Sequence, residues 1–285
     1  MELYAINCGY FKLDGGAMFG VVPKSLWQKK NSSDENNMCT WALRCLLIKT
    51  EDRLILVDNG MGNKQSEKFF SYYYPHGDDT LEVSLKKHGF TCSDITDVIL
   101  THLHFDHCGG SVRWNIERTG YETTFPNAVY WTNKSHWDWA LNPNAREKAS
   151  FLKENLLPIQ QAEQLAFINP SEDVFHPFLP EISIYFTQGH TENMMLPIIH
   201  HPSSTLIYMA DLIPSVAHIP MPWIMSYDLR PLLTLKEKEF LLNYSIKNNC
   251  ILFFEHDPVS ECCNLILSDR GIVPDNSGKL IDFFA

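Results

Sequence analysis

Apolar and polar residues alternate in blocks along the chain, and these blocks predict a mixture of strands and helices. The runs at 41–48 and 54–57 are apolar and are separated by a short polar turn, so we interpret them as the two strands of a hairpin. The segment 78–88 carries several apolar residues after acidic ones, and we interpret it as a helix capped by Asp78 or Asp79.

In the rest of the chain, apolar runs repeatedly end at a histidine or an aspartate. We expect strands at 97–100, 182–186, 205–209 and 251–254, and a helix at 235–246. The polar groups that follow these strands are, in chain order, a cluster beginning at His102, then His190, Asp211 and His256. Strands that deliver polar groups to one end of a sheet build the sites of open α/β architectures, so an α/β fold is expected.

The segment between the two halves is rich in aromatic residues, and we interpret it as a helix entry and loop. Its aromatic side chains are Tyr130, Trp131, His136, Trp137 and Trp139. They could line an apolar substrate pocket, or they could belong to a surface helix that packs its tryptophans on the core. No low-complexity segment or Gly/Ser linker interrupts the chain, so we expect a single domain over 1–285.

Composition and charge narrow the class of protein. Apolar residues make up 45% of the chain and charged residues 20%, as in globular proteins that bury a core. No apolar run reaches the roughly 20 residues of a membrane-spanning helix, and the first residues lack a secretory pattern, so we expect a cytoplasmic location and no membrane partner. A net charge of −11 disfavours a nucleic-acid partner. The eight cysteines lack zinc-finger spacing and are expected to be buried thiols.

The sharpest chemical signal is a polar cluster directly after one expected strand. It consists of His102, His104, Asp106 and His107, followed by two glycines. A lone buried histidine is more often a hydrogen-bonded core residue than a ligand. So many polar groups together are costly to bury unless something binds them, and imidazoles and carboxylates are ligands for zinc, iron or manganese. With the three later groups, the chain offers enough ligands for two clustered divalent ions.

These residues resemble the metallo-β-lactamase superfamily. The resemblance rests on Thr101–Gly110, Gly189–Thr191, Asp211, His256 and the segment Leu56–Gly60, and it extends over about residues 40 to 260. It implies a four-layer αββα sandwich with a dinuclear site at the edge between two sheets. It also implies that His102, His104 and His190 hold one ion, that Asp106, His107 and His256 hold the other, and that Asp211 bridges them. Asp58 would orient one of the ligands.

A dinuclear site of this kind predicts a metal-dependent hydrolase. We expect two divalent ions, which would be zinc, with manganese or iron as alternatives. They would allow a bridging water to exist as hydroxide near neutral pH. That hydroxide would attack a carbonyl or phosphoryl centre, and Asp106 would transfer a proton to the leaving group. The expected substrate is a small ester, lactone or phosphoester.

Within the superfamily, the pattern is most similar to that of N-acyl-homoserine lactonases and related organophosphate hydrolases. Those lactonases carry a Tyr shortly after the bridging Asp, where it helps to bind the lactone. Here Asp211 is followed by Leu212, Ile213 and Pro214, so that Tyr is absent. In the Pro-rich segment beyond, His218 or Tyr227 is expected to contact the substrate.

Two other classes of function stay open. A vestigial member of the superfamily would bind a ligand without catalysis, although a complete ligand set argues against decay. A sulfur-handling dioxygenase would use one iron ion and fewer ligands. Metal content separates the three, because the hydrolase requires two ions, the dioxygenase one iron and the vestigial protein none.

Overall fold

In a computed structural model, which describes residues 1–284, the chain forms two compact units. The first unit comprises 1–9, 43–72 and 76–173, and the second comprises 10–42, 73–75 and the described residues from 174 onward. Two strands, β1 and β2, begin in one unit and end in the other. The expectation of a single domain over 1–285 stays a prediction.

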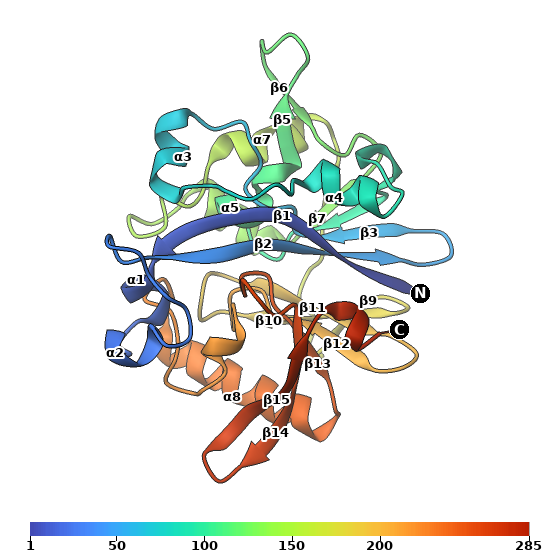
Figure 1. The fold of residues 1–285 in the computed structure, drawn as a ribbon. Coiled ribbons are helices and arrows are strands. Elements are labelled where there is room, and N and C mark those ends of the chain that lie inside the picture. Colours follow the sequence, from blue (N-terminus) through green and yellow to red (C-terminus); the bar gives the residue numbers. More distant parts are fainter. Residues whose placement is uncertain (285) are drawn as a thin grey trace. The chain divides into compact units, whose positions relative to one another are not determined.

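The first unit is built on a sheet whose neighbouring strands are β1-β2-β3-β4-β7-β8, with β5 and β6 paired separately (Figure 1). The strands are β1 (Glu2–Asp14), β2 (Met38–Lys49), β3 (Leu54–Val57), β4 (Asp97–Ile99), β5 (Val112–Trp114), β6 (Tyr121–Thr123), β7 (Val129–Thr132) and β8 (Leu165–Phe167). The helices are α3 (Glu67–Tyr73), α4 (Leu81–Lys87), α5 (Phe105–Cys108), α6 (Lys134–Leu141) and α7 (Lys153–Gln161), with short 3-10 turns η1 (Cys92–Asp94) and η2 (Gly109–Ser111).

The predicted hairpin is confirmed, because β2 pairs antiparallel with β3 and Leu46 lies opposite Val57. From β3 onward the pairing is parallel, through β4 and β7 to β8. All four residues of β3 and all three of β4 are buried. Parallel strands are covered on both faces, which is why β3 and the last two residues of β4 are apolar without alternation.

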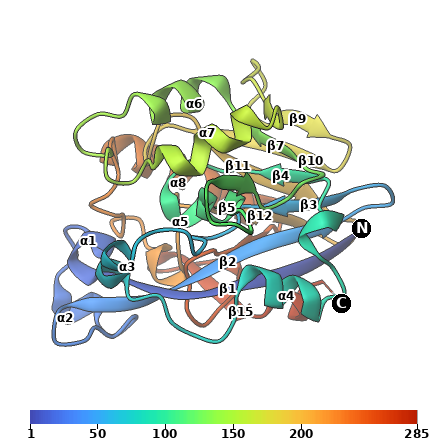
Figure 2. The same cartoon turned by 90° about the horizontal axis from the view of Figure 1, so that it is seen from above.

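The helices α6 and α7 lie together over one face of this sheet (Figure 2). Trp137 of α6 and Ile159 of α7 belong to the same buried cluster as Val98 and Tyr130 from the strands. The interpretation of the aromatic segment as a helix entry and loop was incomplete, since it is the strand β7 followed by α6. Of the two roles left open for its aromatic residues, packing on the core is the one found for Tyr130 and Trp137.

The second unit is built on a sheet with the order β15-β14-β13-β12-β11-β10-β9. Its strands are β9 (His176–Leu179), β10 (Ile182–Thr187), β11 (Met194–His200), β12 (Thr205–Tyr208), β13 (Ile251–Phe253), β14 (Cys262–Ser268) and β15 (Gly271–Gly278). Its helices are α1 (Gly15–Phe19), α2 (Lys24–Trp27) and α8 (Pro231–Lys247), with 3-10 turns η3 (Val216–His218) and η4 (Leu280–Asp282). The long helix α8 packs on this sheet beside β14 (Figure 1).

The strands predicted in the second half are confirmed, with ends that differ by one residue. The helix predicted at 235–246 begins four residues earlier, at Pro231. Proline is favoured at the first position of a helix, because the N–H groups of the first turn have no partner within the helix and proline has no N–H to leave unpaired. The helix predicted at 78–88 is α4, but its cap was wrongly assigned to Asp78 or Asp79. The side chain of Thr80 caps it instead, by accepting a hydrogen bond from the Val83 N–H.

Within the described chain, every helix is too short or too polar to span a lipid bilayer.

A close backbone contact supports the polar cluster that follows β4. The Gly110 N–H donates to the Gly60 carbonyl at 2.9 Å, and the Asn59 N–H donates to the His107 carbonyl at 2.9 Å. A Cβ placed on Gly109 would lie 2.1 Å from the Met61 carbonyl oxygen. The turn after β3 and the segment after α5 can therefore approach only because Gly109 has no side chain.

Replacing Gly109 by Ala should lower the free energy of unfolding by about 3 kcal/mol, because the added methyl group must push two backbone segments apart. Gly120→Ala is the control, since its nearest neighbour to an added Cβ is the Asn115 side chain at 3.9 Å, and it should change stability by less than about 0.5 kcal/mol. Urea denaturation of both variants measures the difference. Equal stabilities would show that the contact is not tight.

Candidate metal centre

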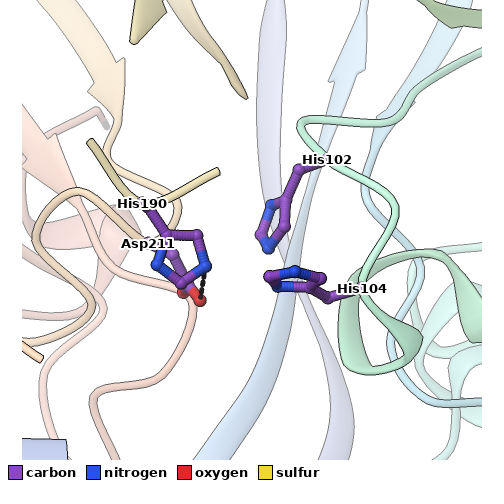
Figure 3. Close-up of side chains that lie close together, drawn as sticks. All are labelled: His102, His104, His190 and Asp211. Atoms are coloured by element: carbon purple, nitrogen blue, oxygen red, sulfur yellow. Dashed lines mark ion pairs between the residues drawn. The ribbon is translucent and has the colours of Figure 1, made fainter. Parts of the chain in front are cut away.

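In the first unit, the segment after β4 gathers four of the predicted metal ligands. His102 and His104 lie on the loop that leaves the strand (Figure 3), and Asp106 and His107 lie on α5. All four are buried. The ring centroids of His102 and His104 are 4.6 Å apart, and those of His102 and His107 are 3.9 Å apart. Three imidazoles and a carboxylate thus crowd into a small buried volume.

Asp58 organises two of these imidazoles from the end of β3. Its carboxylate accepts hydrogen bonds from the Thr101 N–H at 2.8 Å and the Thr101 hydroxyl at 2.6 Å, and it lies 3.2 Å from His107 Nδ1. Thr101 Oγ1 lies 3.1 Å from His102 Nδ1. Because the Thr101 proton is given to Asp58, Thr101 accepts from His102 Nδ1–H, and Asp58 accepts from His107 Nδ1–H. This tautomer leaves the Nε2 lone pair of both rings available for a ligand.

Glu147, which was not predicted, lies near His104, and His136, which was named only as part of the aromatic segment, holds the loop beside it. Glu147 Oε1 lies 3.6 Å from His104 Nε2, and the Glu147 carboxylate accepts hydrogen bonds from Trp139 Nε1 at 2.8 Å and Asn144 Nδ2 at 2.6 Å. His136 Nε2 accepts a hydrogen bond at 2.9 Å from the N–H of Leu103, which lies between the two ligand histidines. No motif surrounds Glu147, so the sequence offers no signal for it.

In the second unit, the remaining three predicted ligands follow three different strands. His190 comes after β10, Asp211 after β12 and His256 after β13, and all three are buried. Asp211 Oδ2 lies 3.1 Å from His190 Nε2, the pair drawn with a dashed line in Figure 3. Asp211 Oδ1 lies 3.2 Å from His256 Nε2. One carboxylate therefore presents a separate oxygen to each imidazole.

The opposite nitrogen of each of these rings has a partner in the same unit. His190 Nδ1 lies 3.0 Å from Asp228 Oδ1, and His256 Nδ1 donates to the Ala42 carbonyl at 2.8 Å. Burial alone would lower the pKa of His190, but Asp211 and Asp228 outweigh it and raise the pKa to about 10. Asp228 was not predicted, because a single Asp in a loop 38 positions from its histidine gives no pattern in the sequence.

The start of α8 fixes the backbone that carries His190. The Glu237 carboxylate accepts from the N–H groups of Gln188 at 2.7 Å and Gly189 at 3.0 Å. Arg230 donates from its side chain to the Gln188 carbonyl at 2.7 Å and from its own N–H to the Gly189 carbonyl at 2.8 Å. Both the N–H groups and the carbonyl groups of the two residues before His190 are therefore hydrogen-bonded.

The two predicted substrate contacts differ in their surroundings. His218 is 1% exposed, with Nδ1 2.7 Å from Ser215 Oγ and Nε2 2.9 Å from the Met18 carbonyl, and its ring stacks on Phe19. Its ring nitrogens and one face therefore serve packing within the second unit, and we do not retain it as a substrate contact. Tyr227 is 40% exposed. Its predicted role stays a prediction.

A model of the metallo-beta-lactamase superfamily matches residues 44–245, which is most of the chain and includes six of the seven predicted ligands. The chain belongs to the metallo-beta-lactamase superfamily. The family recognised from the motif around His102 is thus confirmed, and so is the predicted metallo-β-lactamase fold with its mixed α and β content.

Among relatives, an N-acyl homoserine lactonase from Bacillus cereus is 26% identical over 188 residues, which are 61% of this chain and 63% of the relative. An N-acyl homoserine lactonase from Rhizobium radiobacter is 22% identical and shares 61% of this chain and 62% of its own length. The chain thus spans less than two thirds of the length of these relatives.

Solved structures extend the likeness over nearly the whole chain. A probable metal-dependent hydrolase from Staphylococcus aureus is 28% identical with a TM-score of 0.87, covering 97% of this chain and 96% of the other. A dizinc quorum-quenching lactonase in complex with a product is 23% identical with a TM-score of 0.76, covering 96% and 93%. At this identity the second likeness concerns the fold alone.

The surroundings of His218 predict a pH dependence of stability. Burial lowers the pKa of His218 to about 3, from an ordinary 6.5. Between these values the unfolded chain binds a proton that the folded chain does not, so the stability is full above pH 6.5 and falls as the pH drops toward 3. His218→Phe, which keeps a ring against Phe19, should remove up to about 1.4 kcal/mol per pH unit from the slope of unfolding free energy in this range.

The control for this measurement is His88→Phe, the same substitution at a histidine that is exposed rather than buried. Urea denaturation at a series of pH values gives both slopes. A His218→Phe slope equal to that of the unaltered protein would contradict the assignment of His218 as a buried neutral imidazole.

Proposed function

We propose that the chain is a metal-dependent hydrolase in which the two groups of side chains described above bind a pair of divalent cations. The observation that carries this proposal is the Asp211 carboxylate, which turns one oxygen toward His190 Nε2 and the other toward His256 Nε2. A carboxylate that bridges two cations has this arrangement, with one oxygen for each ion and its imidazole ligand.

The donor chemistry fits divalent zinc. Each proposed imidazole ligand other than His104 has Nδ1 held by a protein group, which orients Nε2 as the donor, as in protein zinc sites. For His104 the roles are reversed, since Nε2 faces Glu147 and Nδ1 is the donor. We assign His102, His104 and His190 to one ion and Asp106, His107 and His256 to the other. We assign Asp211 to both, because its two oxygens lie beside His190 and His256. Manganese or iron would accept the same ligands.

When bound, the two cations would acidify a water molecule and polarise an oxygen of the substrate. The nucleophile predicted from the sequence, a bridging hydroxide, remains part of this proposal. The residues of the chain hold and move the protons around it. Asp58 and Asp228 keep His107 and His190 in one tautomer and orientation. We assign to Asp106, which is buried beside His107, the transfer of a proton to the leaving group.

The proposed substrate is a small ester, lactone or phosphoester. The names of the relatives, N-acyl homoserine lactonases, favour a lactone or another acyl ester. The position after the bridging carboxylate holds Leu212, and the nearby Tyr208 donates its hydroxyl to Glu255 at 2.6 Å, so Tyr208 does not replace the lactonase Tyr. Tyr227, which is partly exposed, is the residue we propose to contact the substrate. A cytoplasmic location stays a prediction from the sequence.

Replacing both His102 and His104 by Ala should abolish metal binding at the first ion and with it hydrolysis, because two of its three imidazole donors are lost. Purified protein should contain two equivalents of divalent metal per chain by elemental analysis, and the double variant should contain fewer. Activity is measured on a panel of lactones, aryl esters and phosphotriesters after reconstitution with zinc, manganese or iron.

A double variant that keeps full metal content and full activity would refute this assignment. One equivalent of iron in the unaltered protein would favour the dioxygenase alternative, and protein that binds no metal after reconstitution would favour the vestigial one.

Asp228→Asn should weaken metal affinity by about 10- to 100-fold while leaving the fold intact, because the amide no longer holds His190 Nδ1 with a charged hydrogen bond. Competition with a chromophoric chelator measures the affinity, and circular dichroism measures the fold. Asp269→Asn, in the exposed turn between β14 and β15, is the matched control. Equal affinities for the two variants would mean that Asp228 does not orient a ligand.

A further inference from the structure

Two cysteine thiols of the first unit lie next to each other on neighbouring strands. Cys8 is on β1 and Cys45 is on β2, and their Sγ atoms are 3.6 Å apart although the residues are 37 positions apart in the sequence. None of the eight cysteines in the described chain is in a disulfide. A disulfide requires the two sulfur atoms to come to about 2.05 Å, so both side chains must rotate toward each other for the bond to form.

The two thiols differ in their access to solvent. Cys8 is partly exposed, whereas Cys45 is fully buried. A reagent in solution can therefore reach Cys8 but not Cys45, and Cys45 can react only with a sulfur that the protein itself presents. This is the arrangement of an attacking thiol with a resolving thiol behind it.

We propose that Cys8 and Cys45 are a modification site that forms a reversible intramolecular disulfide with a small disulfide oxidant such as glutathione disulfide. The Cys8 thiolate attacks one sulfur of the oxidant, which forms a mixed disulfide and releases one glutathione thiolate. The Cys45 thiolate then attacks Cys8 Sγ and displaces the second glutathione. Two protein thiols lose two protons and two electrons, and the electrons reduce one glutathione disulfide to two glutathione molecules.

The position of the pair gives the disulfide a structural consequence. Cys8 and Cys45 lie close to the points where β1 and β2 pass from one unit to the other, between residues 9 and 10 and between residues 42 and 43. The disulfide would link β1 to β2 at this point. Cys8 also packs on Gly60, where an added Cβ would lie 3.1 Å from Cys8 Cβ. The Gly60 carbonyl accepts a hydrogen bond from the Gly110 N–H. Cys8 therefore contacts one residue of the backbone contact that supports His107.

The test uses the full chain, reduced, desalted and then incubated with glutathione disulfide. Remaining thiols are blocked with N-ethylmaleimide, and the peptides are mapped by mass spectrometry without reduction. We expect a peptide that links Cys8 to Cys45, which disappears on treatment with dithiothreitol. Cys8→Ser and Cys45→Ala should each abolish it, whereas Cys92→Ser should keep it, because Cys92 is a partly exposed thiol of the same unit outside the pair.

Three results would overturn the proposal. The first is a stable mixed disulfide of Cys8 with glutathione while Cys45 is recovered as its maleimide adduct. The second is a link from Cys8 to Cys92 in place of Cys45. The third is complete recovery of both thiols as maleimide adducts. Because the unaltered protein supplies the main readout, poor folding of the Cys45→Ala variant would not obscure the result.

Discussion

The contact on which the proposed centre depends is a buried carboxylate, that of Asp211, shared by the imidazoles of His190 and His256. Taking a carboxylate and two imidazoles out of water is unfavourable unless each finds a partner. Asp211 offers one oxygen to each ring, and Asp228 and the Ala42 carbonyl occupy the far nitrogens. The second unit thus holds these three groups in fixed orientations, and a cation beside each carboxylate oxygen would compensate the negative charge that the imidazoles only partly balance.

In the first unit, the buried imidazoles are paired by a series of hydrogen bonds that begins at Asp58. That carboxylate accepts from Thr101 and His107, and Thr101 in turn accepts from His102. Loss of Asp58 would free two imidazoles at once, so the side chains are coupled and their contributions are not additive. These hydrogen bonds depend on a close approach of two backbone segments, which Gly109 and Gly110 permit because they have no side chain. This explains why the motif ends in two glycines.

The sequence predicted the parts of the fold whose pattern is local. The buried strand β3 is a continuous apolar run followed by Asp58, and the short buried strand β4 is followed by the cluster of predicted ligands. The strand β15 was missed because Gly271, Pro274 and Asp275 are poor strand formers, and pairing with β14 alone makes the segment extended. Thr80 was overlooked as a cap because two aspartates precede it and sequence alone cannot tell which side chain reaches the first turn.

The same division holds for the candidate centre. All seven predicted ligands lie at strand ends or on the loop and helix after β4, because a dense motif and strand context identify them. Asp228, which lies 3.0 Å from His190 Nδ1, and Glu147, which lies 3.6 Å from His104 Nε2, come from loops with no periodicity, and only the fold brings them near these imidazoles. For His218, which was predicted as a possible substrate contact, the fold supplies partners at Ser215 and Met18 that the sequence pattern does not reveal.

Anomalous diffraction at the zinc absorption edge, from crystals of the full chain grown with zinc, tests the central claim most directly. The account predicts two anomalous peaks per molecule, one beside each carboxylate oxygen of Asp211, with His190 at one and His256 at the other. A map without peaks near Asp211, or with a single peak that both oxygens share, would contradict it.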